Sequence, residues 1–412
     1  MRSELKDKVD IEKIIKNEHI TICFQPIISI RKNSMAAFEA LCRGIDGEEI
    51  IPPNVLFDCA RDKDLTLELD RLCRKKALEE FASMTKSSED MLLFLNFDAS
   101  VIDRGVVGSG NLHDAVSYLN LNPSNIVIEI NEAKTNNTRA LTAFIDTYKN
   151  YGFIVALDDI GSGYSNLNRL AVVKPDILKI DMALISGIDK EFYKQEVVKS
   201  MVELARKIGA LVVAEGVETQ EEAINSLDLG VDMLQGYYFA RPQNMRSIDF
   251  EGLRQKRSKL TGVFKQYILT KLKTERDKKD YFARTASQVA KELSKVCSCS
   301  FDEILTHIAH SYCHVECIYI LYKTGIQFSE TVCSFTSFSS RKKSIFYPAA
   351  KGTDHSLKDY YYLAVGNGQG GFVTEPYVSI ATGSLCVTIS ETFTNVEGDE
   401  FVLCIDNVIN DT

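Results

Sequence analysis

The sequence predicts an α/β protein: a TIM-type barrel with one antiparallel strand, joined by a helical linker to a smaller α+β domain. Two observations predict the barrel. Eight short apolar runs occur in the first 245 residues, and most are continuous rather than alternating, as in strands buried on both faces. Between most of them lie stretches with apolar residues at helical spacing and a glycine near the end. Strands and helices that alternate eight times are typical of such a barrel.

The eight predicted strands follow one another along the chain in a regular order. They are "ITICFQPII", "MAAFEAL", "LLFLNF", "IVIEI", "IVALDD", "ILKID", "LVVAEG" and "MLQGYY". Only "SIRKNS" separates the first run from the second, which is too short for the helix that a parallel connection needs. We therefore expect these two strands to form an antiparallel hairpin, while helices such as "QEVVKSMVELARKIG" connect the later strands.

The barrel is predicted to span residues 1–246, and the chain changes character after it. Residues 247–296 contain no proline and no glycine after Gly262, which predicts one or two long linking helices. We interpret their many lysines and arginines as a solvated face, with phosphate or membrane binding as the alternative. Residues 297–412 contain the strand-like runs "VECIYILY", "SIFYPAA", "YVSIATGSLCVTIS" and "EFVLCIDNVI", which predict an α+β domain.

Composition limits the classes of function that remain open. A net charge of -9 over 412 residues disfavours general nucleic-acid binding, which needs a basic surface. The sequence has no apolar run of about 18 residues, and its first residues are charged, so we expect no membrane span, no signal peptide and a cytoplasmic protein. Its 11 cysteines, an odd number scattered along the chain, fit reduced thiols better than a disulfide framework.

Polar residues stand at or near the ends of seven of the eight runs. They are Glu39, Asn96, Glu129, Asp158, Asp159, Lys179, Asp181, Glu215 and Gln235. Taken singly, such a residue is more often a helix cap or a solvated loop residue, but parallel strand ends converge on one face of a barrel. So many carboxylates need divalent cations, and their oxygens suit Mg²⁺ or Mn²⁺. Histidine and cysteine are absent from the set, which disfavours zinc.

Several motifs in Met1 to about Arg246 are similar to those of a known family. They are "FQPI", "EALCR", "IEINE", "DDIGSGYSNL", "KPDILKID", "VVAEGVET" and "LQGYYFARP". In this order they resemble the EAL domain, the phosphodiesterase that opens the bacterial messenger cyclic di-GMP to linear pGpG. The motifs cover about 60% of the chain, so the resemblance does not depend on one tripeptide.

The resemblance implies a role for each matching residue and a cofactor of two Mg²⁺ or Mn²⁺ ions. It assigns the first ion to Glu39, Asn96, Glu129 and Asp158, and the second to Asp158 with Asp159. Lys179 and Glu215 match the pair that positions or deprotonates the attacking water, and Glu39 is counted with them as catalytic. Gln25 and Arg43 match contacts with the substrate, and Gln235 joins them while supporting the water and the metals. Glu132 matches the acid that tethers the glycine-rich loop after Asp159.

Two readings of the barrel stay open, and the second domain adds a further expectation. Because Glu39, Lys179 and Glu215 are all present, an active enzyme is favoured over a silent cyclic di-GMP receptor; another metal-dependent phosphoesterase is a third possibility. The family also implies a homodimer. "DYYYLAVGNGQGGFVTEPYVSIATGSLCVTIS" resembles a Cache/PAS-like sensory module, which implies an unidentified small-molecule ligand and regulation of the barrel. "HIAHSYCHVEC" could suggest a metal site, but we interpret it as small buried residues where a helix turns into a strand.

Overall fold

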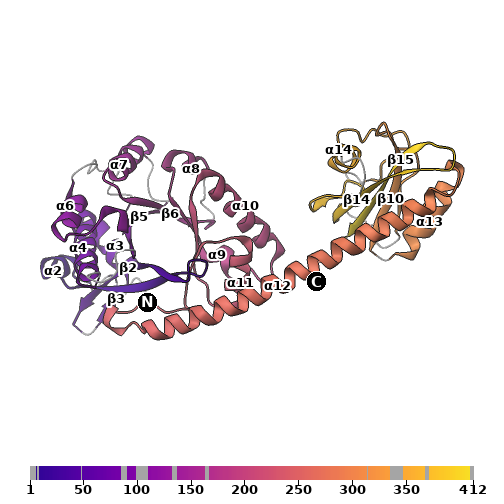
Figure 1. Cartoon of the computed structure of the whole chain (residues 1–412). Helices are drawn as coiled ribbons and strands as arrows, with labels where there is room; N and C mark the ends of the chain where they lie inside the picture. Colours follow the sequence, from indigo (N-terminus) through magenta and orange to yellow (C-terminus); the bar gives the residue numbers. More distant parts are fainter. Residues whose placement is uncertain are drawn as a thin grey trace. The chain divides into compact units, whose positions relative to one another are not determined.

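The computed structural model describes residues 6, 9–47, 49–84, 91–98, 110–131, 137–162, 167–312, 314–334, 347–366 and 371–408. Contacts between Cα atoms divide the chain into two compact units, Met1–Ile268 and Leu269–Thr412. We call them the barrel unit and the second unit (Figure 1). The boundary between them falls inside one helix, α12 (Phe250–Leu293).

Each of the eight predicted runs forms a strand of the barrel unit. The strands are β1 (Ile20–Ser29), β2 (Ser34–Asp46), β4 (Leu92–Phe97), β5 (Ile126–Asn131), β6 (Ile154–Ile160), β7 (Ile177–Ile180), β8 (Leu211–Ala214) and β9 (Met233–Gln235). They pair in the order β1-β9-β8-β7-β6-β5-β4-β2, and a β1–β2 pairing closes the ring. β1 is antiparallel to both of its neighbours and the other ring pairs are parallel, which confirms the reversed strand. The short β3 (Glu49–Ile51), which was not predicted, pairs antiparallel with the end of β2.

Helices cover the outside of this ring, as Figure 1 shows for α7, α8 and α10. The helices are α2 (Ile11–Lys16), α3 (Pro53–Asp62), α4 (Thr66–Met84), α6 (Asn111–Tyr118), α7 (Thr138–Asn150), α8 (Leu167–Val173), α9 (Met182–Ile185), α10 (Phe192–Ile208) and α11 (Gln220–Leu229), with short 3₁₀ turns η2 (Pro123–Asn125) and η4 (Met245–Ser247). Gly209 and Gly230 end α10 and α11 in the left-handed conformation, which glycine adopts without a Cβ clash.

One apolar side chain from each ring strand fills the inside of the barrel. These eight residues form a separate buried cluster, which we call the barrel plug: Ile27, Ala37, Phe94, Val127, Ala156, Ile177, Val213 and Met233. A larger cluster between the strands and the surrounding helices forms the outer core. Because the plug closes the lumen, a site built from inward-facing side chains must lie at an end of the strands rather than in the middle of the barrel.

The second unit is an antiparallel sheet with helices on its two faces. After the last turns of α12 come η5 (Ser298–Ser300), α13 (Phe301–Ser311), β10 (Val315–Tyr322), β11 (Val332–Cys333), α14 (Asp359–Gly366), β12 (Phe372–Val373), β13 (Tyr377–Val378), β14 (Leu385–Thr394) and β15 (Glu400–Val408). The strand order is β11-β10-β15-β14-β12, with β13 also paired to β14. The segment predicted to hold one or two linking helices therefore forms one, α12.

Alternation along β10 and β15 sends side chains to two different layers. Ile318 and Leu403 pack with α13 and the end of α12, whereas Tyr319 and Cys404 pack on the opposite face against α14. The predicted strand "SIFYPAA" is wrong for its described residues 347–350, which form no strand. The Ala349 carbonyl instead accepts hydrogen bonds from the side chains of Thr331 and Gln327.

The cysteines differ from the expectation of reduced thiols throughout. The structure joins Cys317 to Cys333 and Cys297 to Cys299, and the six other described cysteines are free. Cys317 and Cys333 stand opposite each other on the adjacent strands β10 and β11, a pairing that scattered sequence positions do not predict.

The predicted break of "HIAHSYCHVEC" from helix into strand is confirmed, since α13 ends at Ser311 and β10 starts at Val315. His307 and His310 are exposed, however, so the expectation that they are buried is wrong. They lie on the outer side of α13, whose Leu305 and Ile308 face the core. Cys313 lies outside the described residues.

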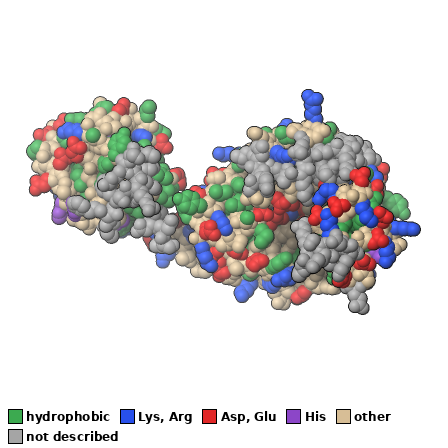
Figure 2. All heavy atoms as spheres, turned by 180° about the vertical axis from the view of Figure 1, so that it is seen from behind, with side chains coloured by type: hydrophobic (Ala, Val, Ile, Leu, Met, Phe, Trp, Pro, Cys, Tyr) green, Lys and Arg blue, Asp and Glu red, His purple; other side chains and the backbone are tan. Residues whose placement is uncertain are grey.

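Every helix in the described part of the chain is too short or too polar to span a lipid bilayer. On the face of the barrel unit seen in Figure 2, Lys and Arg side chains are interspersed with Asp and Glu side chains.

Candidate active site

A layer of polar side chains lies next to the barrel plug, two residues away from the plug residue on each ring strand. Because side chains alternate along a strand, the residue two positions from each plug residue faces the same inner side. In the seven strands that run the same way these residues are Glu39, Asn96, Glu129, Asp158, Lys179, Glu215 and Gln235. In the reversed β1 the equivalent residue precedes the plug residue Ile27 and is Gln25. These eight predicted residues thus belong to one ring, which we call the polar layer.

Lys179 is the centre of the polar layer. It is 1% exposed, and its ammonium contacts Glu129 and lies 2.5 Å from Glu215 Oε1. Asp158 Oδ1 lies 3.4 Å away and Glu39 Oε2 3.7 Å away. Four carboxylates from four strands therefore share one lysine, and the cluster keeps an excess of negative charge.

A chain of amide side chains holds one edge of the polar layer. Asn96 donates from Nδ2 to Glu39 Oε1 over 2.8 Å, and Gln235 donates from Nε2 to Glu39 Oε2 over 2.5 Å. The same Gln235 nitrogen lies 3.1 Å from Gln25 Oε1, and Gln25 donates to the carbonyl of Ala240. These bonds fix the orientation of Glu39 and leave the Asn96 carbonyl oxygen as the atom that it can offer to a cation.

The electrostatic environment separates the pKa values of these groups. Burial alone would lower the pKa of Lys179, but the surrounding carboxylates raise it well above its ordinary value. Burial raises the pKa of Glu215 to about 8. Burial and the Glu39 charge raise the pKa of Glu129 well above its usual range. For Glu39 itself, the Lys179 charge and the hydrogen bonds from Gln235 and Asn96 outweigh burial and lower the pKa.

The adjacent carboxylates of Asp158 and Asp159 reach the same side of β6 because the strand is irregular there. Leu157 pairs with Leu178 and Ile160 with Ile180, so two β6 residues stand opposite the single residue Lys179. Asp159 adopts a left-handed backbone, with φ of 58°. Neighbouring side chains on a regular strand would point to opposite faces. The bulge is therefore what lets both acids serve one site.

The donor set fits hard divalent cations. Oxygens of Asp158, Asp159 and Glu215 lie within 4.8 Å of one another. Glu129 is 1% exposed, and its Oε2 has no hydrogen-bond partner among the described residues. Burial, followed by repulsion from Asp158, raises the pKa of Asp159, so a cation there would relieve a strain that is already present. Carboxylate and amide oxygens without sulfur or imidazole favour Mg²⁺, Mn²⁺ or Ca²⁺ over zinc.

A cavity of about 510 Å³ opens beside the polar layer and includes charged residues that were not predicted. Asp70 and Arg74, one turn apart on α4, form a buried ion pair there, and Arg74 lies over the Phe97 ring at 4.0 Å. Burial raises the pKa of Asp70 to about 6. Arg61 also lines the cavity, with its guanidinium 4.0 Å from Asp98 Oδ2. The signal in the sequence was a charged pair on the apolar face of the predicted helix "LTLELDRLCRKKALEEFASM".

Three predicted residues are not joined to the polar layer by contacts within the described part of the chain. Arg43 is half-buried on β2, and its guanidinium donates to the neighbouring Cys42 carbonyl over 2.8 Å. Asp181 caps α9 by accepting from the Ala183 amide, which is the ordinary role of an acid after a strand. Glu132 lies outside the described residues.

Comparisons with known proteins agree with this arrangement. Residues 8–242 match the family model described as the EAL domain. The uncharacterized EAL-domain containing protein YkuI of Bacillus subtilis is 26% identical over 396 residues, which are 93% of each chain. The cyclic di-GMP phosphodiesterase PdeA of Borreliella burgdorferi is 29% identical over 239 residues, which are 57% of this chain and 35% of PdeA.

Solved structures give the same picture. The structure of Bacillus subtilis YkuI in complex with its substrate c-di-GMP and calcium superimposes with a TM-score of 0.81 at 25% identity, and the match covers 98% of this chain and 100% of that one. Klebsiella pneumoniae BlrP1, in a complex with manganese and cy-diGMP, gives a TM-score of 0.50 at 28% identity over 55% of this chain and 56% of that one.

Proposed function

The chain belongs to the EAL domain family through residues 8–242, and on this premise we propose that its barrel unit hydrolyses cyclic di-GMP to linear pGpG. In this reaction a water oxygen bonds to one bridging phosphorus and the bond from phosphorus to a ribose 3′-oxygen breaks, which leaves a 5′-phosphate and a 3′-hydroxyl. The observation that carries the proposal is the complete polar layer, in which a buried lysine and a ring of acids and amides meet beside a cavity.

The proposed site holds two divalent ions, Mg²⁺ or Mn²⁺, in the oxygen-rich part of the layer. We assign Glu39, Asn96, Glu129 and Asp158 to one ion, and Asp158 and Asp159 to the other. Bound ions would supply charge neutralisation at the phosphate and a water of lowered pKa. The excess of carboxylates over lysine is what supports this assignment.

We assign Lys179 and Glu215 to the attacking water. The raised pKa of Lys179 keeps its ammonium charged, so that it can orient a water oxygen and screen the carboxylates around it. Glu215, only 2.5 Å from that ammonium, has a raised pKa and can accept the proton that the water loses. Glu39 is held by contacts with Asn96 and Gln235, and we assign it to the positioning of Lys179, 3.7 Å away.

We assign substrate contacts to Gln25, Arg43 and Gln235. Gln25 and Gln235 already lie 3.1 Å apart at the edge of the layer. Arg43 lies four residues beyond Glu39 on β2, about 13 Å along a strand, which places it where a second phosphate or a base of an extended dinucleotide could reach. A guanidinium can bind two oxygens of one phosphate. Glu132 is proposed to steady the loop after Asp159.

The test is chromatography of the products after mixing the full chain with cyclic di-GMP and Mg²⁺, Mn²⁺ or Ca²⁺. We expect pGpG with at least one of these ions and none after chelation with EDTA. Glu39→Gln keeps the size of the side chain but removes the charge, and should abolish turnover. Glu203→Gln, at an exposed position on α10, is the matched control and should stay active.

Binding of cyclic di-GMP without product under all three ions would overturn the enzyme in favour of the silent receptor. Turnover of other phosphodiesters at a similar rate would instead favour a general phosphoesterase on the same barrel. Regulation by the second unit, its Cache/PAS identity, homodimerisation and a cytoplasmic location stay predictions from the sequence.

A further inference from the structure

The second unit contains a cavity of about 860 Å³ that the barrel chemistry does not use. Its floor is the sheet face that carries Tyr319 of β10 and Asp406 of β15, opposite to the face that packs on α13. Residues 347–358, α14 and residues 374–381 provide its walls. The volume lies within the range of about 300–1,000 Å³ that is usual for small-molecule sites.

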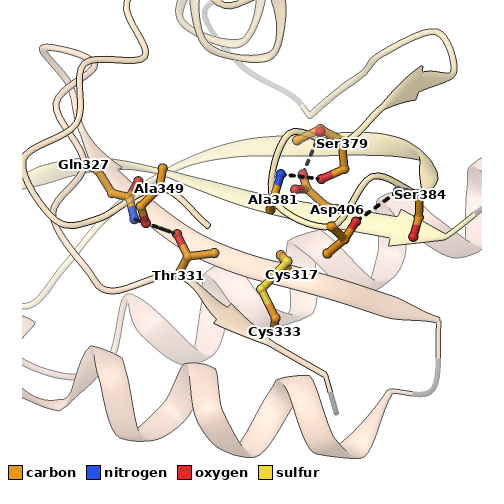
Figure 3. Close-up of a disulfide and its surroundings, with 11 residues drawn as sticks. Cys317, Gln327, Thr331, Cys333, Ala349, Ser379, Ala381, Ser384 and Asp406 are labelled. Atoms are coloured by element: carbon orange, nitrogen blue, oxygen red, sulfur yellow. Dashed lines mark hydrogen bonds between the residues drawn. A yellow bond between two sulfur atoms is a disulfide. The ribbon is translucent and has the colours of Figure 1, made fainter. Parts of the chain in front are cut away.

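Asp406 is a buried carboxylate in this cavity without a cation beside it. It is 4% exposed, and the Thr388 hydroxyl donates to its Oδ1 over 2.7 Å. Figure 3 shows it beside Ser379 and Ala381, which also line the cavity. No lysine, arginine or histidine among the described residues forms an ion pair with it. Burial, together with the charge of Glu316, raises its pKa to about 7. A carboxylate kept in such a place usually has a partner that the isolated chain lacks.

The one buried histidine of the cavity does not supply that positive charge. The carboxamide of Gln327 is oriented by its Nε2, which donates to Ser329 O over 3.0 Å and to Thr331 Oγ1 over 2.8 Å. Its Oε1 therefore accepts from His355 Nε2 at 2.9 Å, while His355 Nδ1 accepts from the Tyr360 hydroxyl at 2.7 Å. The ring therefore carries one proton, on Nε2, and is neutral. Burial also lowers the pKa of His355, which favours the same neutral form.

The walls and rim suit a cation with an apolar body. Aromatic rings line the cavity at Tyr319, Phe372 and Tyr377, and a cation is attracted to the face of such rings. The described charged residues are four acids against one lysine, a formal charge of −3: Asp354, Asp359, Glu375 and Asp406, with Lys358. The three other acids are exposed at the rim, where they would attract a cation towards Asp406.

We propose that this cavity binds a small organic cation, a protonated amine on an apolar or aromatic body, with Asp406 as its counter-charge. The amine bonds to the Asp406 carboxylate on the floor while the body of the ligand packs between the rings. The site is independent of the barrel chemistry, and its test needs no measurement of hydrolysis.

The first experiment uses calorimetric titration of the full chain at about pH 8, above the pKa of Asp406. The probes are 2-phenylethylamine, tyramine and cyclohexylmethylamine, each paired with the alcohol of the same shape. We expect saturable binding of at least one amine and at least tenfold weaker binding of its alcohol. Failure of all three amines to bind, or equal binding of amine and alcohol, would overturn the proposal.

Variants locate the binding site. Asp406→Asn keeps the shape of the side chain and should weaken the amine about tenfold or more, whereas Asp302→Asn, at an exposed position at the start of α13, should change nothing. Leu357 is 90% exposed on the cavity wall, so a charge there does not endanger folding. Leu357→Lys should weaken and Leu357→Glu should strengthen amine binding by a few fold, and neither should affect the alcohol. Insensitivity of the amine to both position 357 variants would place it elsewhere.

Discussion

The two units bury negative charge in opposite ways. In the barrel unit, Lys179 lies among four carboxylates and amide side chains fix their orientation. In the second unit, Asp406 is buried with only the Thr388 hydroxyl as a partner among the described residues. The first arrangement carries part of its compensating charge within the chain, and the second depends on a proton or on a molecule from outside. Buried acids alone therefore do not identify a metal site; what surrounds them does.

Removing the built-in cation should give the largest effect. Lys179→Met leaves several buried carboxylates without their shared partner, and we expect hydrolysis to fall by about 10²–10³-fold. Without divalent ions the barrel should also lose about 3–5 kcal/mol of stability, because breaking a buried pair leaves uncompensated charge. Product chromatography and chemical unfolding measure the two effects. The matched control is Lys190→Met, whose ammonium is 81% exposed. Wild-type stability in the Lys179 variant would show that the barrel does not need its internal cation.

Raising the pH should destabilise the second unit through Asp406. Its folded pKa of about 7 lies above its unfolded value of 3.8, so the folded state binds the proton more tightly. The stability this gives is complete below about pH 4 and is lost as the pH rises to about 7, a change of up to ~4 kcal/mol. Hydrogen exchange of β15 amides in the full chain measures it. Asp406→Asn should flatten the profile; an unchanged profile would show that Asp406 is not the titrating group.

Divalent ions should stabilise one unit and leave the other unchanged. At a concentration about 100 times the dissociation constant, Mn²⁺ should add about 2.7 kcal/mol to the barrel unit. Asp158→Asn should remove most of this gain, because Asp158 is assigned to both ions. Scanning calorimetry with and without Mn²⁺ is the measurement. A similar gain in the stability of the second unit would contradict this contrast between the units, since it would place a metal among the buried acids of the second unit.

The smallest effect should come from the Thr388 hydroxyl, which donates to Asp406 and is also hydrogen-bonded to the Tyr377 hydroxyl. Thr388→Val keeps the side-chain shape and removes both hydrogen bonds. At about pH 5, where Asp406 is protonated, we expect a loss of about 1–2 kcal/mol. Unfolding by urea of this variant and of Thr274→Val, an exposed position on α12, gives the comparison. Equal stability of the two variants would mean that water replaces the threonine.

The sequence predicted the barrel and its polar layer because both follow from one rule. Each strand carries an apolar plug residue and, two positions along, a polar residue, and period-two geometry turns this spacing into two stacked layers. Asp159 does not follow this rule, since only the bulge in β6 brings its side chain to the same side of the strand as that of Asp158. The ion pair of Asp70 and Arg74 was missed because a charged pair on a helix is usually a solvated one.

The second unit was predicted less completely. β11 and β12 are too short to give a periodic signal, and the Ala349 carbonyl, in the described end of "SIFYPAA", accepts from side chains instead of pairing with a strand. Asp406 lies in the apolar run "EFVLCIDNVI", where an isolated acid gives no sign of the cavity that forms when β15 meets residues 374–381. Such a site depends on packing between distant segments, which no local pattern encodes.

The left-handed backbone at Asp159 implies a conflict between stability and function in the barrel. A residue other than glycine in this conformation costs about 1 kcal/mol, and here the cost falls on an acid whose pKa is already raised by burial. Glycine at position 159 would relieve both penalties and remove a proposed metal ligand. Selection or engineering for thermal stability alone should therefore favour variants that keep the barrel fold and lose its catalytic activity. Position 159 should be among the first to change.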